Sequence, residues 1–241
     1  MYGMYGYGYG YGFDPTIILV LIGVALSLWA QGRVNSTFSR YSRVRSMTGM
    51  TGAEAARRLL NAQGIYDVTV QPIAGELTDH YDPRTKSVNL SQSVYGATSV
   101  AAIGVAAHEC GHAMQDNEGY APLRFRSALV PAANFGSKLS WPLILLGLVF
   151  GGLGSPLVEI GILMFSLAVL FQLVTLPVEY NASARAVRLL DSQGILAGEE
   201  VSGTRKVLNA AALTYVAAAA TSILQLLRLI ILFGGRNRRD N

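Results

Sequence analysis

The chain has 241 residues, of which 51% are hydrophobic and only 14% are charged, against about 25% charged residues in ordinary soluble domains. This composition indicates a membrane protein of one domain or two small ones. The net charge of +4 comes without a basic stripe interleaved with aromatic residues, so nucleic acid is excluded from the expected partners. The single Cys110 excludes an intramolecular disulfide.

The N-terminal region predicts a tail followed by a membrane anchor. Residues 1–12 are a Tyr/Gly-rich tail of low complexity, which is expected to be flexible. Residues 13–31 predict a transmembrane helix, because they approach the ~20 residues that span a membrane and lack the basic start of a signal peptide. Four arginines follow this segment: Arg33, Arg40, Arg43 and Arg45. By the positive-inside rule, this flank is expected in the cytoplasm and the N-terminus outside.

The longest polar stretch, residues 33–138, predicts a cytoplasmic domain that includes a small β-hairpin. Thr51 and Glu54 have the spacing of a capping box at the start of a helix. Residues 77–90 predict two short strands around a turn at Asp82. Such a hairpin could bind an extended peptide by strand addition.

Within this domain, the run His108-Glu109-Cys110-Gly111-His112 has the pattern H-E-x-x-H. On an α-helix the two histidines lie on one face, where both imidazoles can bind one zinc ion. Glu109 projects toward the side of the same site, where its carboxylate can take a proton from a metal-bound water. The run therefore predicts a zinc site with Glu109 as its general base, whereas Cys110 lies on another face and is expected to pack.

The second half of the chain predicts three more hydrophobic helices. Residues 139–178 predict a transmembrane hairpin with its tip outside, and residues 179–205 predict a helix on the cytoplasmic side. Residues 206–233 predict a fourth hydrophobic helix, which is followed by a basic tail at residues 234–241. This last helix either spans the membrane or lies half-buried at its surface, because the basic tail would otherwise stand outside, against the positive-inside rule.

A catalytic zinc ion needs a third protein ligand besides two histidines. Glu179 is a candidate, because it follows a membrane helix that emerges on the same side as the histidines. Other carboxylates compete for the role, namely Asp116, Glu118, Asp79 and Asp82. Asp116 has the best spacing of these, four residues beyond His112, but it lies on no separate helix that could close the site.

Three blocks of the sequence together resemble the YugP-type neutral zinc metallopeptidases of bacterial membranes. They are LTDHYDP at residues 77–83, AAHECGHAMQ at residues 106–115 and PVEYNAS at residues 177–183. The family looks similar to the gluzincin membrane proteases of the HtpX and CAAX-protease group, in which the glutamate of an E-x-x-A-D pattern is the third zinc ligand. Glu179 and Ala182 match this pattern, and Ser183 stands where aspartate is usual. The resemblance therefore implies that Glu179 is the third ligand and that the chain is proteolytic.

Together these features predict a mainly α membrane protein with about four hydrophobic helices and a zincin-like helical catalytic domain. It would be an endopeptidase of the bacterial cell membrane, with one zinc ion per chain held by His108, His112 and Glu179. Its active site would face the cytoplasm and would cleave membrane proteins or peptides.

Two questions stay open at this point. Three residues are unranked candidates for stabilising the oxyanion, namely Tyr215, Arg185 and His80, and for His80 a structural or surface role is favoured. The rival interpretations are a zinc-binding membrane scaffold without turnover, which would have no use for Glu109, and a transporter-like helix bundle with an incidental motif.

Overall fold

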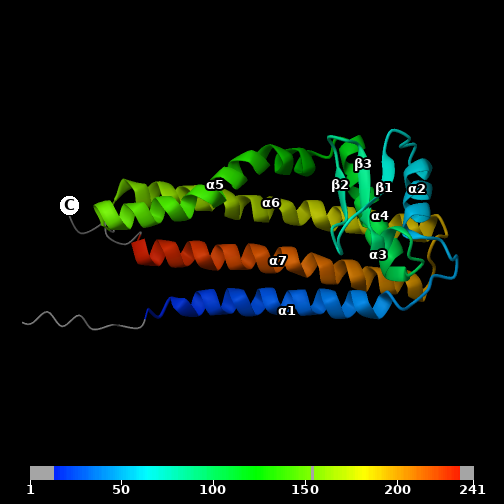
Figure 1. Ribbon diagram of the computed structural model, residues 1–241, viewed down its shortest axis with the longest axis horizontal. Helices are drawn as coiled ribbons and strands as arrows, with labels where there is room; N and C mark the ends of the chain where they lie inside the picture. The colour runs from blue at the N-terminus through cyan, green and yellow to red at the C-terminus, as the bar shows by residue number, and fades with distance from the viewer. Residues whose placement is uncertain (1–13, 153–154, 234–241) are drawn as a thin grey trace, which may run out of the picture.

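The computed structural model describes residues 14–152 and 155–233, and these residues are mainly helical. Four long helices run side by side, and the short helices and strands gather at one end of them (Figure 1). The long helices are α1 (Ile17–Tyr41), α5 (Ala121–Gly151), α6 (Pro156–Ser192) and α7 (Glu199–Phe233). The tails predicted at residues 1–12 and 234–241 lie outside the described residues.

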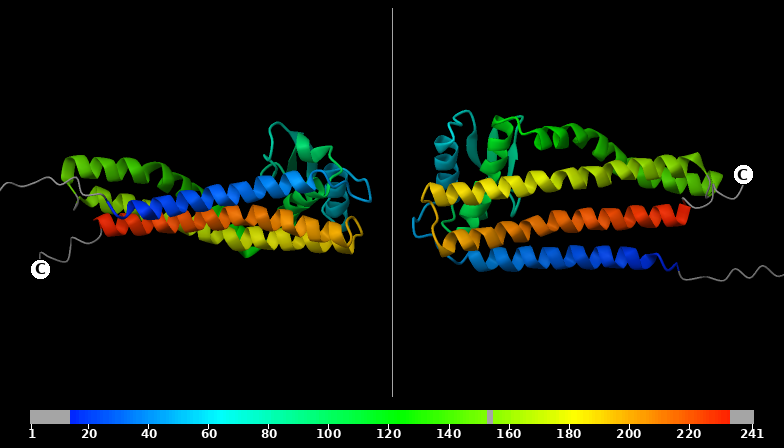
Figure 2. Two further views of the ribbon diagram at one scale, coloured as in Figure 1. Left: turned by 90° about the horizontal axis from the view of Figure 1, so that it is seen from below. Right: turned by 180° about the vertical axis from the view of Figure 1, so that it is seen from behind.

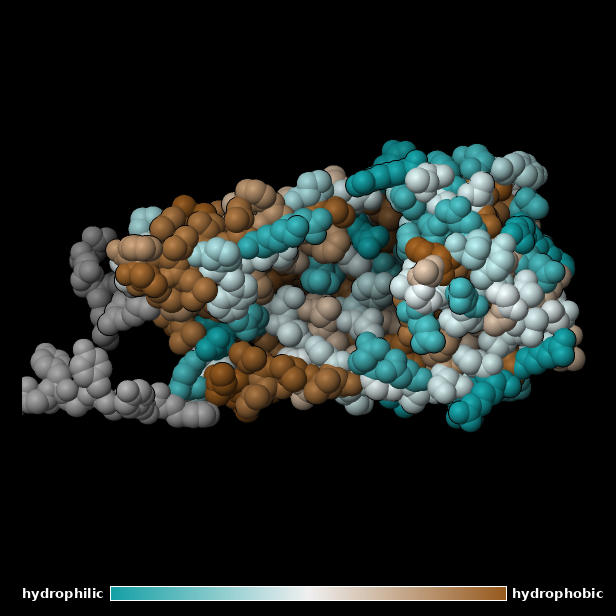
Figure 3. Space-filling view, viewed as in Figure 1, coloured by the Kyte–Doolittle hydropathy of each residue, from teal (hydrophilic) through white to brown (hydrophobic). Residues whose placement is uncertain are grey.

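These four long helices carry the apolar surface of the molecule. Each is long and hydrophobic enough to cross a membrane, and only 11% to 28% of the residues in its most apolar window are buried. Hydrophobic residues gather over the half of the molecule that lies away from the strands (Figure 3). Such an outward-facing apolar surface is expected where helices contact lipid. The prediction of a mainly α membrane protein with about four hydrophobic helices is confirmed.

Polar residues mark both ends of this apolar region. Arg228 of α7 forms an ion pair of 2.9 Å with Asp14, just before α1, and also bonds Thr16. Lys206 lies 22 residues earlier on α7, which corresponds to ~33 Å of helix. A bilayer has a hydrocarbon core of ~30 Å. The length of α7 between these two basic residues therefore matches one membrane crossing.

The remaining elements pack around α4 (Val100–Asn117). They are α2 (Gly52–Ala62), α3 (Gln92–Tyr95), β1 (Thr69–Ile73), β2 (His80–Asp82) and β3 (Ser87–Ser91). The strand order is β1-β3-β2, with β2 antiparallel to β3 in the predicted hairpin and β1 parallel to β3. This order makes β2 an edge strand of the sheet.

Local sequence signals explain where two of these helices begin. The predicted capping box is present at α2, where the Thr51 side chain accepts a hydrogen bond from the Glu54 N–H and the Glu54 carboxylate accepts one from the Thr51 N–H. Ser99 caps α4 by accepting a hydrogen bond from the backbone N–H of Ala102. Both caps satisfy N–H groups that the first turn of a helix leaves without a partner.

The long helices differ in their regularity. α5 contains Pro131 and Pro142, and its first half bends away from α6 toward the strands (Figures 1 and 2), as proline inside a helix favours. In contrast, α6 continues through Pro177 and Glu179 to Ser192 without a break. A single helix therefore includes both a segment apolar enough to cross a membrane and Glu179.

Two glycines let α4 approach the membrane helices closely. A Cβ atom added at Gly111 would lie 2.6 Å from the Ala182 carbonyl oxygen of α6, and one at Gly104 would lie 2.9 Å from the Thr204 side chain of α7. The backbone of Ala182 cannot move out of the way as the end of a flexible side chain can. The contact at Gly111 therefore depends on the absence of a side chain.

This contact yields a stability prediction. We expect Gly111→Ala to lower the free energy of unfolding by roughly 1–3 kcal/mol, because the new methyl group forces α4 and α6 apart. Thermal unfolding in detergent measures the effect. Gly32→Ala is the matched control, since its methyl group would meet no neighbouring atom on α1. Equal stability of Gly111→Ala and the wild-type protein would contradict the close contact.

Candidate metal centre

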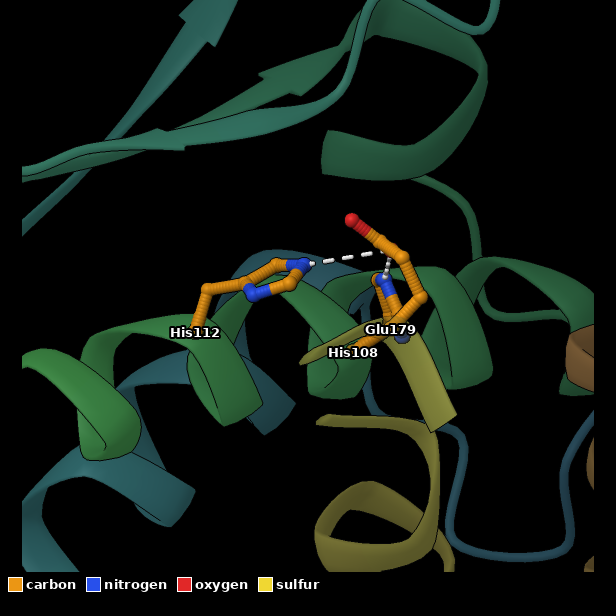
Figure 4. Close-up of side chains that lie close together, drawn as sticks. All are labelled: His108, His112 and Glu179. Atoms are coloured by element: carbon orange, nitrogen blue, oxygen red, sulfur yellow. Dashed lines mark hydrogen bonds and ion pairs between the residues drawn. The ribbon is translucent and has the colours of Figure 1, made fainter. Parts of the chain in front are cut away.

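Three side chains from two helices converge beside the β-sheet. His108 and His112 lie on α4, and Glu179 reaches them from α6 (Figure 4). One ligand atom of each lies within 4.8 Å of the other two, and no other such group of histidine, cysteine or acidic residues occurs among residues 14–152 and 155–233. Glu179 is almost completely buried, at 2% exposure. Burying a charged carboxylate without partners would cost free energy. The groups around Glu179 therefore determine what the site can bind.

The distances from Glu179 to the two histidines match those between neighbouring ligands of zinc. Glu179 Oε2 lies 3.2 Å from His108 Nε2 and 3.5 Å from His112 Nε2. Ligand atoms bound tetrahedrally at 2.0–2.1 Å from zinc would lie about 3.3 Å apart. The carboxylate of Glu179 is therefore placed to share one zinc ion with each of the two imidazoles.

Hydrogen bonds to the outer nitrogens orient both imidazoles. Gln115 uses its Nε2 to donate to the Val178 carbonyl and to Asn181, so its Oε1 accepts from Nδ1 of His112 at 3.0 Å. Ser183 Oγ lies 3.1 Å from Nδ1 of His108. Both contacts leave Nε2 free to bind a metal, which is the arrangement found around zinc-binding histidines. Ser183 thus contacts one of the two histidines from the position where the resemblance described above would place an aspartate.

The charges around His112 favour a positive charge at this position. Burial alone would lower the pKa of His112, but the hydrogen bond to Glu179 and the charges of Glu109 and Glu179 outweigh burial and raise it. A raised pKa means that the site favours positive charge. A zinc ion bound to the neutral imidazole would supply such a charge.

Glu109 lies beside the group without joining it. Its side chain is buried, and one carboxylate oxygen accepts a hydrogen bond of 3.0 Å from the backbone N–H of Tyr81. This N–H belongs to the edge strand β2. The sheet therefore fixes Glu109 next to the candidate metal ligands.

The lining of a cleft of about 700 Å³ includes His108, Glu109, His112 and Glu179. β2 and the turn after it form one wall, and the first half of α5 forms another. A smaller cavity of about 330 Å³, lined mainly by α1, α4 and α7, shares several of these residues with the cleft. The group is therefore accessible from the side of the strands and from the side of the membrane helices.

The competing carboxylates are engaged elsewhere. Asp116 bonds Lys86 and Tyr81, and Glu118 pairs with Arg185. Asp79 accepts from Ser91, and Asp82 accepts from the backbone of Arg84. None of them belongs to the group with the two histidines.

Two of these carboxylates also show how the cleft is charged. Partial burial would raise the pKa of Asp116, but hydrogen bonds from Lys86 and Tyr81 outweigh burial and lower it, so Asp116 is ionised. Burial raises the pKa of Asp79 despite its hydrogen bonds from Ser91.

The three oxyanion candidates separate in space. Tyr215 and His80 line the cleft, and Tyr215 also lines the smaller cavity. Arg185 lines neither cavity, because it pairs with Glu118 and donates to Asn181. The imidazole of His80 contacts the Thr78 carbonyl and Asn89 instead of the group.

Arg126 is a residue of the cleft that the sequence analysis missed. Its guanidinium lies 3.9 Å from Glu179 Oε1, the oxygen turned away from the histidines, and over the ring of Phe171. Its Nε is buried without a hydrogen-bond partner among the described residues. A basic residue in the first turns of an otherwise apolar membrane helix was the available signal.

Comparisons with known proteins found one family and one similar protein. The model of a family described as "Putative neutral zinc metallopeptidase" matches residues 16–234. A similar protein is the "Putative membrane protease YugP" of Bacillus subtilis (strain 168), which is 49% identical over 224 residues, or 93% of this chain and 98% of that protein. No solved structure matches the chain.

The contact between Ser183 and His108 gives a prediction for metal affinity. We expect Ser183→Ala to weaken zinc binding about tenfold or more, because the imidazole loses the group that orients it. Competition between the protein and a fluorescent zinc chelator measures the dissociation constant. Ser192→Ala on the same helix, whose hydroxyl bonds only the local Leu189 carbonyl, should leave the affinity unchanged. Equal affinities of both variants would show that Ser183 does not support the site.

Proposed function

This chain belongs to the neutral zinc metallopeptidase family identified above, and we propose that it is a membrane-embedded endopeptidase that hydrolyses membrane proteins or peptides. The observation that carries the proposal is the convergence of His108, His112 and Glu179 beside the carboxylate of Glu109. Two imidazoles and one carboxylate from the protein leave one position of a tetrahedral zinc site open. Open zinc sites are typical of catalysis, and closed ones of structural roles.

We assign the three converging residues to one zinc ion per chain. When bound, zinc would polarise the scissile carbonyl and lower the pKa of water toward ~7. The Nδ1 atom of His112 donates to Gln115 Oε1, which keeps this imidazole in the tautomer that binding requires, and the contact between Ser183 Oγ and Nδ1 of His108 orients the other ring.

Glu109 is the proposed general base. Its carboxylate would accept a proton from the attacking water and then deliver this proton to the leaving amine. The N–H of Tyr81 holds one carboxylate oxygen, so the other oxygen can face the substrate. This N–H belongs to the sheet that would bind the substrate. The sheet would therefore fix the position of the base relative to the bound peptide.

The substrate is proposed to bind as an extended strand along β2. This strand is at the edge of the sheet and lines the cleft, and an edge strand offers backbone groups for one more strand. Tyr215 is the proposed oxyanion donor, because its side chain lines both cavities that meet at the metal ligands. A neutral phenol can donate a hydrogen bond without displacing a metal ligand.

The site is proposed to face the cytoplasm, at the surface of the bacterial cell membrane. Glu179 lies 23 residues after the start of α6, or ~35 Å along the helix, which exceeds the ~30 Å hydrocarbon core of a bilayer. The arginines after α1 support the cytoplasmic side. We assign residues 33–138 and 179–205 to this side, which places the site within reach of segments that emerge from the membrane.

A non-catalytic zinc-binding scaffold is the alternative, and Glu109→Gln distinguishes the two. We expect the variant to bind zinc as the wild-type protein does but to lose at least about 99% of casein cleavage, since the amide cannot accept the proton. Zinc analysis and cleavage assays on the detergent-purified proteins test this. Chelation of zinc should abolish wild-type cleavage, and zinc should restore it. Bound zinc without any cleavage by the wild-type protein would favour the scaffold.

Tyr215→Phe tests the oxyanion assignment. We expect kcat to fall about 10²-fold, the typical cost of removing one such donor, while KM and zinc affinity change little. Steady-state cleavage of a fluorogenic peptide separates kcat from KM. Tyr180→Phe, a neighbour of Glu179 outside both cavities, is the matched control. An unchanged kcat in Tyr215→Phe would exclude the hydroxyl from the reaction.

A further inference from the structure

A cavity of about 690 Å³ lies between α1, α6 and α7 and shares no lining residue with the cleft. Its α1 wall is the stripe Arg33, Ser36, Thr37, Arg40 and Tyr41. Three- and four-residue spacings place these side chains on one face of the helix. The opposite wall includes Lys206 and Asn209 of α7 and Tyr180 of α6. The cavity is therefore polar on both sides, although it lies between helices that are otherwise apolar.

Positive charge in this cavity is not compensated. Arg33, Arg40 and Lys206 line it, and no acidic residue does. None of the three forms an ion pair with a residue that the structure describes; Arg40 lies over the ring of Tyr41. In contrast, Arg126, Arg185 and Arg228 each contact a carboxylate. Three unpaired cations around one cavity favour an anionic ligand.

The position of the cavity along the three helices identifies the source of that anion. Arg33 follows the apolar segment of α1, Tyr180 follows that of α6, and Lys206 precedes that of α7. Lys206 is also ~33 Å along α7 from Arg228, the ion-paired residue at the other end of the apolar region. All three helices thus change from apolar to polar at this cavity, which is where a bilayer has its phosphate groups.

We propose that this cavity binds the phosphate of an anionic phospholipid headgroup. Arg33, Arg40 and Lys206 would neutralise the phosphate, and guanidinium groups can donate two parallel hydrogen bonds to its oxygens. Ser36 and Asn209 would hydrogen-bond the polar headgroup, and the acyl chains would lie along the apolar parts of α1 and α7. Basic pockets between membrane helices are recognised sites for anionic lipids.

Lipid titration of the full-length, detergent-purified protein tests the proposal. Native mass spectrometry would compare short-chain phosphatidylglycerol with phosphatidylcholine of the same chain length. We expect the wild-type protein to retain phosphatidylglycerol at least about tenfold better, since each basic residue near the surface contributes to anionic lipid binding. The variant R33Q/R40Q/K206Q should lose this preference, and R33K/R40K/K206R should keep it. Inorganic phosphate at equal concentration should not displace the lipid.

A matched variant separates the cavity from net charge. R57Q/R58Q/R84Q removes three charges from residues that do not line the cavity, and it should retain the preference. Unfolding temperatures near that of the wild-type protein show that the variants are folded. Loss of the preference in this control, or no preference in the wild-type protein, would overturn the proposal. Displacement of the lipid by inorganic phosphate would overturn the lipid as ligand and indicate a soluble phosphate.

Discussion

The close contact between α4 and α6 is the constraint on which the candidate metal site depends. His108 and His112 come from a helix outside the apolar region, and Glu179 comes from a helix that continues out of it. Only at Gly111, where α4 has no side chain, can the backbone of α6 come near enough for the carboxylate to reach both imidazoles. The glycine inside the H-E-x-x-H run is thus part of the site, although it has no chemistry of its own.

The same contact brings several charged groups into a small volume. Glu179 is almost completely buried between two imidazoles and the guanidinium of Arg126. Desolvation of such a carboxylate is expensive, and the nearby positive charge offsets it only when the geometry is good. A divalent cation bound by the three residues would supply further positive charge. Metal binding would then be linked to the folding of this region.

Much of this arrangement could be predicted from the sequence, because its signals are local or repeated. Apolar length predicted the four hydrophobic helices, and the spacing of His108 and His112 placed both on one helical face. Glu179 was reached by topology and by resemblance. The contact between the Tyr81 N–H and Glu109 could not be predicted. It joins residues 28 apart, and its donor is a backbone N–H, which every residue except proline has. Periodicity describes a helix or strand by itself and does not say which elements meet.

Arg126 and Ser183 are two further residues whose contacts could not be predicted from the sequence. Arg126 stands out by residue type, but its contact with Glu179 depends on how the first half of α5 bends over the cleft. Ser183 could be compared with the usual aspartate, but only the structure gives the 3.1 Å between its hydroxyl and His108.

Because α6 is long and unbroken, a small change in its tilt would move Glu179 by a comparatively large distance. Its far end lies at the tip of the membrane hairpin, and Glu179 lies ~35 Å along the helix from that tip. A rotation of the helix by one degree about its tip moves the carboxylate by ~0.6 Å, whereas metal–ligand distances are held within about 0.2 Å. The tilt of a membrane helix is set by its packing against neighbouring helices. The close approach of α4 and α6 at Gly111 therefore also limits how far Glu179 can swing away from the two imidazoles.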